Sequence, residues 1–236
     1  MKPLFLLACV AAVAVAETPG APGAGSALAT AEPGLYAVIN TSMGQITAQL
    51  FEQDAPLTVS NFVALATGLQ PWKDPKTGAM VNRPLYTNLA FNRVIPEYVI
   101  QTGDPTNTGT YDCGVRVKDE LDSGLRFDRP GRLGLMNSGE SDTGGCQFFI
   151  TDDAYSSLDP SRTRNGYTVF GQVVEGQDVV NKISNVPCDA RGRPRTPVRM
   201  VSVSIRRVGE GPAPPKPEPV SESRQPSAPT KLPKLD

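Results

Sequence analysis

Residues 36–41 begin with a short apolar run, and along residues 45–51 polar and apolar residues alternate; both segments are predicted to be strands. A period of two is typical of β-strands, because successive side chains point to opposite faces of a sheet. In the second segment Ile46, Ala48 and Leu50 share one face, which we expect in the core, and the residues between them share a face that we expect in water. Gly44 precedes this segment and can adopt a turn conformation, so the pattern predicts a β-hairpin.

The next segment has helical spacing. From Pro56 onward, apolar residues recur three or four positions apart, at Val59, Phe62, Val63 and Ala66. This spacing places them on one face of an α-helix. Thr58 or Asp54 could cap the start of this helix, and Gly68 is suited to end it.

A second helix is predicted over residues 176–184, where Val179, Val180 and Ile183 form an apolar face. A loop rich in proline, lysine and glycine covers residues 70–84, and the remaining apolar runs are short and separated by turn residues. Because no strand-helix-strand rhythm repeats, the sequence favours a closed or nearly closed antiparallel barrel over a parallel sheet.

The two ends of the chain differ in composition from the middle. Residues 4–16 are an apolar run after Lys2 that ends in an Ala-x-Ala pattern, which predicts a signal peptide over residues 1–16 that is too short to remain as a membrane span. Residues 17–33 are expected to be a disordered linker. Residues 209–236 contain eight prolines and are expected to be a disordered, proline-rich tail. The folded domain is therefore expected over residues 34–208.

A signal peptide predicts an exported protein, and we expect a periplasmic location. The alternative is a lipid anchor on Cys9, because residues 6–9 resemble a bacterial lipoprotein box. Only eight residues precede Cys9, however, and apolar residues continue beyond it. Export without an anchor is therefore the preferred interpretation.

Charge and composition exclude several classes of function. The net charge of −1 and the isoelectric point near 5.6 provide no basic surface for nucleic acid. The chain has no histidine, which argues against a metal site and against histidine-based catalysis. Cys113, Cys146 and Cys188 lack metal-ligand spacing and can form at most one internal disulfide; their simplest interpretation is as small core residues. We therefore expect no metal and no cofactor.

Four motifs occur in a fixed order along the chain: residues 91–104, with Arg93 among apolar residues, and residues 134–139, 144–150 and 169–176. Together they resemble the cyclophilin family of peptidyl-prolyl cis-trans isomerases over residues 34–208. The resemblance implies a mainly β fold, a closed eight-stranded antiparallel barrel with a helix over each end. It also implies catalysis of cis-trans isomerisation at X-Pro bonds in proline-containing polypeptides.

Arg93 is the expected catalytic residue. The rotation barrier of a peptide bond, about 18–20 kcal/mol, arises from resonance, and twisting the bond returns a lone pair to the prolyl nitrogen. A fixed donor directed at that nitrogen stabilises the twisted state more than the planar one. A guanidinium is always charged and presents several donors in a rigid fork. The alternative for Arg93 is an ordinary surface arginine in an exposed ion pair.

The resemblance also implies a substrate-binding site. Its apolar pocket for the proline ring would be formed by Tyr98, Val99, Phe149, Leu158 and Tyr167, with Met136 beside it. Hydrogen bonds to the peptide would come from Gln101, Asn137 and Gln147. Ordinary core packing is the alternative for the apolar residues, and hydrogen bonding to the chain's own backbone is the alternative for the polar ones.

Three positions depart from the family pattern. Asn92 stands where a histidine is usual; asparagine can keep a hydrogen bond but offers no imidazole ring. Tyr167 stands where many relatives have histidine and bacterial relatives often have tyrosine. Ser157 stands where cyclosporin-sensitive members have a tryptophan, so we expect weak cyclosporin binding.

Two other classes of function compete with an isomerase. The first is a proline-peptide binding module or holdase that retains the pocket with little turnover. The second is a scaffold that acts mainly through its proline-rich tail. A monomer is the default expectation for the oligomeric state.

Overall fold

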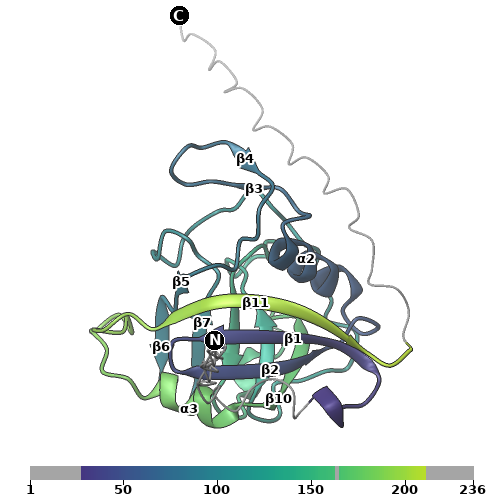
Figure 1. Ribbon diagram of the computed structural model, residues 1–236. Coiled ribbons are helices and arrows are strands. Elements are labelled where there is room, and N and C mark those ends of the chain that lie inside the picture. Colours follow the sequence, from purple (N-terminus) through teal and green to yellow (C-terminus); the bar gives the residue numbers. More distant parts are fainter. Residues whose placement is uncertain (1–27, 163–164, 211–236) are drawn as a thin grey trace, which may run out of the picture.

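The computed structural model describes residues 28–162 and 165–210 (Figure 1). Nine strands form one antiparallel sheet in the order β5-β11-β1-β2-β10-β8-β9-β7-β6, and β3 and β4 form a separate pair. The strands are β1 (Gly34–Thr41), β2 (Gly44–Leu50), β3 (Trp72–Lys73), β4 (Met80–Val81), β5 (Leu89–Ala90), β6 (Arg93–Ile95), β7 (Val99–Thr102), β8 (Arg132–Leu135), β9 (Phe148–Thr151), β10 (Val169–Glu175) and β11 (Arg199–Val208).

The antiparallel, mainly β class is confirmed, whereas the sheet contains nine strands instead of the expected eight. The two edge strands, β5 and β6, are neighbours in the chain and are separated only by Phe91 and Asn92. The sheet is therefore strongly curled. The higher count arises because residues 89–95 form two short ladders with different partners, β11 and β7, instead of one continuous strand.

The predicted hairpin is present as β1 and β2, with Ile39 opposite Ile46 and Ala37 opposite Ala48. Both pairs are buried in the main core. The expectation of a wet second face is wrong at Thr47, which is fully buried. Thr47 lies opposite Val38, itself buried, whereas Gln45 and Gln49 on the same face stay partly exposed.

Two α-helices lie on opposite sides of the strands β11, β1 and β2, which run side by side (Figure 1). They are α2 (Pro56–Thr67) and α3 (Gln177–Ser184), and both match the sequence prediction. Gly68 follows α2 with a φ of 79° and donates its N–H to the Ala64 carbonyl, so it ends the helix as expected. A 3₁₀ turn, η1 (Ser156–Leu158), lies between β9 and β10 in the chain.

The start of α2 is capped from a distant part of the chain. Neither Thr58 nor Asp54 provides a side-chain cap for this helix. Instead, the Glu120 carboxylate accepts the backbone N–H groups of Leu57 and Thr58, each at 2.9 Å, from 63 and 62 residues away. The carboxylate satisfies two N–H groups that have no partner within the helix and places negative charge at its positive end.

We therefore expect Glu120→Ala to lower the free energy of unfolding by about 1–2 kcal/mol, since it removes both the cap and the charge. Glu120→Gln, which keeps one acceptor oxygen, should lose less. Chemical denaturation, analysed with a common m-value, measures the loss of stability in both variants. Equal stability of Glu120→Ala and the native protein would show that water replaces the cap at no cost.

The main core lies between the sheet and α2. Its centre is a group of four aromatic rings, in which Phe62 of α2 lies 5.1 Å from Tyr86, 5.3 Å from Phe148 and 5.3 Å from Phe170 between ring centroids. These four rings are almost completely buried. Strand β9 thus contributes Phe148 to the core, and its neighbour Phe149 must point to the other face.

Among the described residues, no helix combines the length and apolar character needed to cross a bilayer. The expected signal peptide over residues 1–16, most of the linker at 17–33 and nearly all of the tail at 209–236 lie outside the described residues. Within the last part of that linker, the Glu32 carbonyl accepts the Tyr36 hydroxyl at 2.8 Å.

Candidate active site

Arg93 opens β6 and faces Gln101 of β7 in the register of the two strands. It is half-buried, and its guanidinium carbon lies 6.0 Å from the centroid of the Tyr98 ring, within cation–π range. Within residues 28–162 and 165–210, Arg93 forms no ion pair with a carboxylate. Arg93 is therefore not an ordinary surface arginine held in an ion pair.

Gln101, the ladder partner of Arg93, is hydrogen-bonded to a second glutamine. Gln101 and Gln147 are both buried, and the Gln101 side-chain Nε2 donates to Gln147 Oε1 at 3.1 Å. Gln147 Nε2 in turn donates to the carbonyls of Gly109 and Tyr111, each at 3.3 Å. These bonds link β7, the start of β9 and the loop at residues 109–111 into one polar network.

The loop at residues 104–109 is held by one buried carboxylate that the sequence interpretation did not assign to the site. Asp104 accepts the N–H groups of Thr106, Thr108 and Gly109 at 2.6, 3.0 and 2.6 Å. This arrangement fixes the Gly109 carbonyl that Gln147 contacts. Asp104 is the last residue of the first motif, so its position in that motif was the available signal.

A second hydrophobic cluster, which we call the site cluster, lies apart from the main core. It consists of Val99, Phe127, Phe149, Leu158 and Val169, with Phe51, Tyr98, Leu125, Met136 and Tyr167 packed against it. The site cluster includes the five residues that the resemblance assigned to the apolar pocket, and also Met136, which was expected beside it. The five are Tyr98, Val99, Phe149, Leu158 and Tyr167. The structure thus gathers all six residues in one place, although they come from five separate parts of the chain.

Phe149 is central to the site cluster. Its ring lies 5.5 Å from Phe127, nearly stacked, and 5.3 Å from Tyr167, edge to face. Gly134 of β8 lies opposite Phe149 in the ladder, and a Cβ there would overlap the Phe149 ring. The glycine therefore provides the space that the ring occupies. Phe127 was not identified from the sequence, because it stands alone in a polar stretch.

Asn137 is buried and is bonded to the chain's own backbone. Its side-chain nitrogen donates to the Gly166 carbonyl at 2.9 Å, and its oxygen accepts the Gly139 N–H at 3.1 Å. This matches the alternative considered for Asn137, and it anchors the segment before Tyr167 to the segment after Met136. A side chain held in this way has its orientation fixed.

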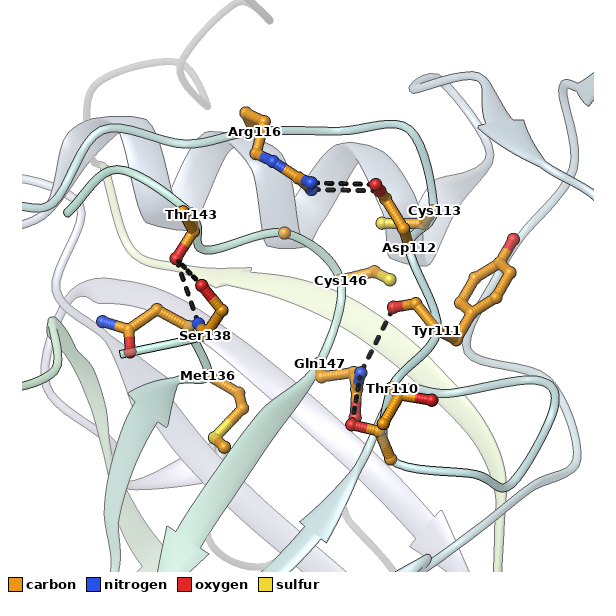
Figure 2. Close-up of a pocket in the computed structure, with 13 residues that line it drawn as sticks. Thr110, Tyr111, Asp112, Cys113, Arg116, Met136, Ser138, Thr143, Cys146 and Gln147 are labelled. Atoms are coloured by element: carbon orange, nitrogen blue, oxygen red, sulfur yellow. Dashed lines mark hydrogen bonds and ion pairs between the residues drawn. The ribbon is translucent and has the colours of Figure 1, made fainter. Parts of the chain in front are cut away.

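A pocket of about 170 Å³ adjoins the site cluster (Figure 2). Three of the expected site residues, Met136, Asn137 and Gln147, line it. The rest of its wall comes from Ser138, Thr143, Gly145, Cys146 and the segment 109–116. At its rim, Arg116 forms an ion pair with Asp112 at 2.8 Å. The remaining expected site residues lie outside this pocket, around Arg93 and in the site cluster.

Asn92 does not form the side-chain hydrogen bond that the sequence suggested it could keep. Its backbone N–H donates to the Gln101 carbonyl at 3.0 Å, whereas its buried side-chain oxygen has no partner among the described residues. A Cβ placed at Gly109 would lie 3.1 Å from the Asn92 side-chain nitrogen, so the loop passes close to Asn92.

An ion-pair group borders the site cluster. The Asp128 carboxylate accepts bonds from Arg129 and from Arg132, which is buried and lies over the Phe51 ring. The hydrogen bonds from Arg129, followed by those from Arg132, hold the pKa of Asp128 well below its usual range. This carboxylate therefore remains ionised in the folded protein at pH values where it would be protonated in the unfolded chain.

A depressed pKa stabilises the folded state above the unfolded pKa, near 4, and that contribution is lost as pH falls toward the folded value. We expect Asp128→Asn to destabilise the protein at pH 7 by about 1 kcal/mol, a figure kept small because Asp128 is half-exposed and screened by solvent. The difference between variant and native protein should shrink steadily below pH 4. Urea denaturation at pH 7, 4 and 3 measures this difference in the free energy of unfolding. A difference that does not change with pH would contradict the lowered pKa of Asp128.

Within the described residues, no group of three or more cysteine, aspartate or glutamate side chains is arranged to hold a metal ion. The site itself offers a guanidinium, several amides and an apolar cluster.

Comparisons with known proteins identify relatives of this chain. The model of the cyclophilin type peptidyl-prolyl cis-trans isomerase family matches residues 36–205. Peptidyl-prolyl cis-trans isomerase A of Mycobacterium tuberculosis is 38% identical over 182 residues, which cover 76% of this chain and 94% of that protein. Peptidyl-prolyl cis-trans isomerase B of Streptomyces anulatus is 38% identical over 175 residues, 72% of this chain and 96% of that protein.

The fold is also similar to solved structures. A cyclophilin type isomerase of Cryptosporidium parvum, crystallised in the presence of the dipeptide Ala-Pro, is similar with a TM-score of 0.58 and 27% identity. The match covers 75% of this chain and 99% of that one. A second crystal structure of the same isomerase gives a TM-score of 0.59 over 72% and 96% of the two chains.

Proposed function

Because this chain belongs to the cyclophilin-type peptidyl-prolyl cis-trans isomerases, we propose that it uses Arg93 to accelerate rotation about X-Pro bonds in unfolded or flexible exported proteins. The observation that carries the catalytic assignment is the Arg93 guanidinium, which has no carboxylate partner among the described residues and lies beside the site cluster. Its donors remain available for a substrate.

The remaining site residues have supporting roles in this proposal. The site cluster receives the proline ring against Tyr98, Val99, Phe149, Leu158 and Tyr167, with Met136 at its margin. Gln101, Asn137 and Gln147 present amide groups to the peptide backbone. As the bond twists, the prolyl nitrogen becomes pyramidal, and the Arg93 guanidinium donates to its lone pair. A gain of about 4 kcal/mol in the twisted state corresponds to roughly a thousandfold acceleration.

An isomerisation assay on a proline tetrapeptide tests this proposal directly. We expect turnover by the purified protein and faster refolding of a substrate protein whose slow phase is proline-limited. A folded protein that binds the tetrapeptide without turnover would instead be a proline-peptide binding module or holdase.

We place this activity in the periplasm, and the support is the sequence of residues 1–16 alone. The proline-rich tail at residues 209–236 is assigned no part in turnover. Deleting residues 209–236 should leave kcat/KM unchanged, whereas the scaffold alternative requires the tail. A monomer is sufficient for this chemistry, because every assigned residue belongs to one chain.

We also propose that the sheet closes as an eight-stranded barrel in which residues 89–95 act as one bent strand. The support is that β5 and β6 lie at opposite ends of the strand order yet are joined through Phe91 and Asn92.

Cyclosporin should inhibit this enzyme weakly. The position of the tryptophan donor in sensitive members is held by Ser157 in η1, whose side chain is exposed and cannot replace an indole N–H. We expect inhibition only at cyclosporin concentrations far above that of the enzyme. A dose series with complete inhibition at concentrations comparable to the enzyme would refute this.

A further inference from the structure

Two cysteines face each other in the wall of the pocket. Cys113 comes from the segment 109–116, and Cys146 immediately precedes Gln147. Both are buried, with 1% and 2% of their surface exposed, and both line the pocket. Figure 2 shows the two sulfur atoms in the same part of the pocket wall, each extending from its own segment.

The backbone holds the two segments close together. The Val117 N–H donates to the Gly144 carbonyl at 2.8 Å, which pairs the segment after Cys113 with the segment before Cys146. A Cβ placed at Gly145 would lie 3.4 Å from the Cys113 sulfur. The Tyr86 hydroxyl donates to the Cys146 carbonyl at 3.0 Å and fixes the backbone of Cys146.

We propose that Cys113 and Cys146 are a redox-active pair that forms a reversible disulfide when a small peroxide enters the pocket. In the structure both are free thiols. The third described cysteine, Cys188, belongs to a different segment, where its thiol donates to the Val186 carbonyl at 3.2 Å.

The two thiols differ in acidity in the direction that this reaction needs. A hydrogen bond with Cys146 lowers the pKa of the Cys113 thiol. Burial raises the pKa of the Cys146 thiol well above its usual value. Cys113 is therefore the first to ionise and the attacking nucleophile, and Cys146 is the resolving thiol.

The reaction balances with hydrogen peroxide as the oxidant. The Cys113 thiolate attacks one peroxide oxygen, the O–O bond breaks, and the hydroxide that leaves takes a proton to become water. The Cys113 sulfur is then a sulfenic acid. Cys146 loses its proton and attacks that sulfur, the S–O bond breaks, and a second water leaves. Two thiols are oxidised by two electrons, and one peroxide is reduced to two waters.

The disulfide would link the 109–116 segment covalently to the residue next to Gln147. That segment already supplies the Gly109 and Tyr111 carbonyls that accept from Gln147. The new bond would close the loop between residues 113 and 146. It should raise the midpoint of thermal unfolding by on the order of 10 °C, because it restricts the unfolded chain.

The test is to treat the full-length protein with hydrogen peroxide, block remaining thiols with an alkylating agent and map peptides by mass spectrometry. We expect one cross-linked peptide pair containing Cys113 and Cys146, lighter by two hydrogens than the separate peptides. A reducing phosphine should remove it and reverse the rise in unfolding temperature. Isomerase activity is not needed for this readout, so the result is independent of the proposed function.

Variants separate this pair from the other cysteines. Cys188→Ser should form the same cross-link, whereas Cys113→Ser should form none and leave Cys146 open to alkylation after unfolding. If Cys113→Ser fails to fold, Cys113→Ala takes its place and should likewise form no cross-link. The peptide map of the native protein then still shows whether Cys113 and Cys146 are linked. Cross-links to Cys188 or Cys9, or oxidation of Cys113 to a sulfinic acid while Cys146 remains a thiol, would overturn the proposal.

Discussion

Replacing Arg93 with alanine should lower kcat/KM for X-Pro isomerisation by on the order of a thousandfold. The loss arises because the donor acts on a lone pair that exists only in the twisted state, so its removal raises the barrier by about 4 kcal/mol. Most of the loss should be in kcat, since the proline ring binds through the site cluster, which does not contain Arg93. A coupled assay on a proline tetrapeptide, or exchange broadening in NMR spectra, measures both constants.

Two control variants make this result specific. Arg93→Lys keeps the charge but loses the planar fork of donors, so it should retain only part of the activity. Arg191→Ala removes an exposed arginine from the loop next to Arg93 and should leave turnover near native, although it changes the net charge equally. Activity of Arg93→Ala within about threefold of native, in a variant that is folded by circular dichroism, would remove Arg93 from the mechanism.

Alanine at Phe148 and alanine at Phe149 should have different consequences, although the two residues are neighbours on β9 and almost equally buried. Phe148 packs among Phe62, Tyr86 and Phe170 in the main core. Its loss should lower the free energy of unfolding by about 3–5 kcal/mol and leave the kcat/KM of the folded fraction near native.

Phe149 lies in the site cluster, on the opposite face of the strand. Its loss should also destabilise the protein, but in addition it removes about 1.5–3 kcal/mol of apolar contact from the proline site, so kcat/KM should fall roughly 10- to 100-fold. Denaturation curves and kinetics at temperatures where both variants are folded separate the two effects. An equal loss of kcat/KM in both variants would mean that Phe149 acts only through packing.

The elements defined by local patterns could be predicted from the sequence. The β1–β2 hairpin and the two helices follow from spacings of two and of three to four residues, and Gly68 supplies its own signal as a helix end. The residues that these elements contact from distant parts of the chain could not be predicted in this way. The cap on α2 comes from Glu120, far away in the chain, and Thr47 is buried because Val38 packs opposite it, which only the strand register determines.

The site shows the same division between local and long-range information. Periodicity alone does not distinguish Phe148 from Phe149, and only the resemblance assigned Phe149 to the pocket. Phe127 was missed because no regular pattern surrounds it. Cys113 and Cys146 were interpreted as small core residues, and burial agrees with this, but their proximity depends on the bridge between Val117 and Gly144, which no spacing in the sequence predicts.

The short edges of the main sheet determine how client chains can be held. A protein that meets unfolded polypeptides risks pairing with them if it exposes a long free strand edge. Here β5 has two residues and β6 three, and both run into the same two-residue connection at Phe91 and Asn92. At β5 and β6, a proline-containing chain therefore finds an edge of only two or three residues on which to add a strand.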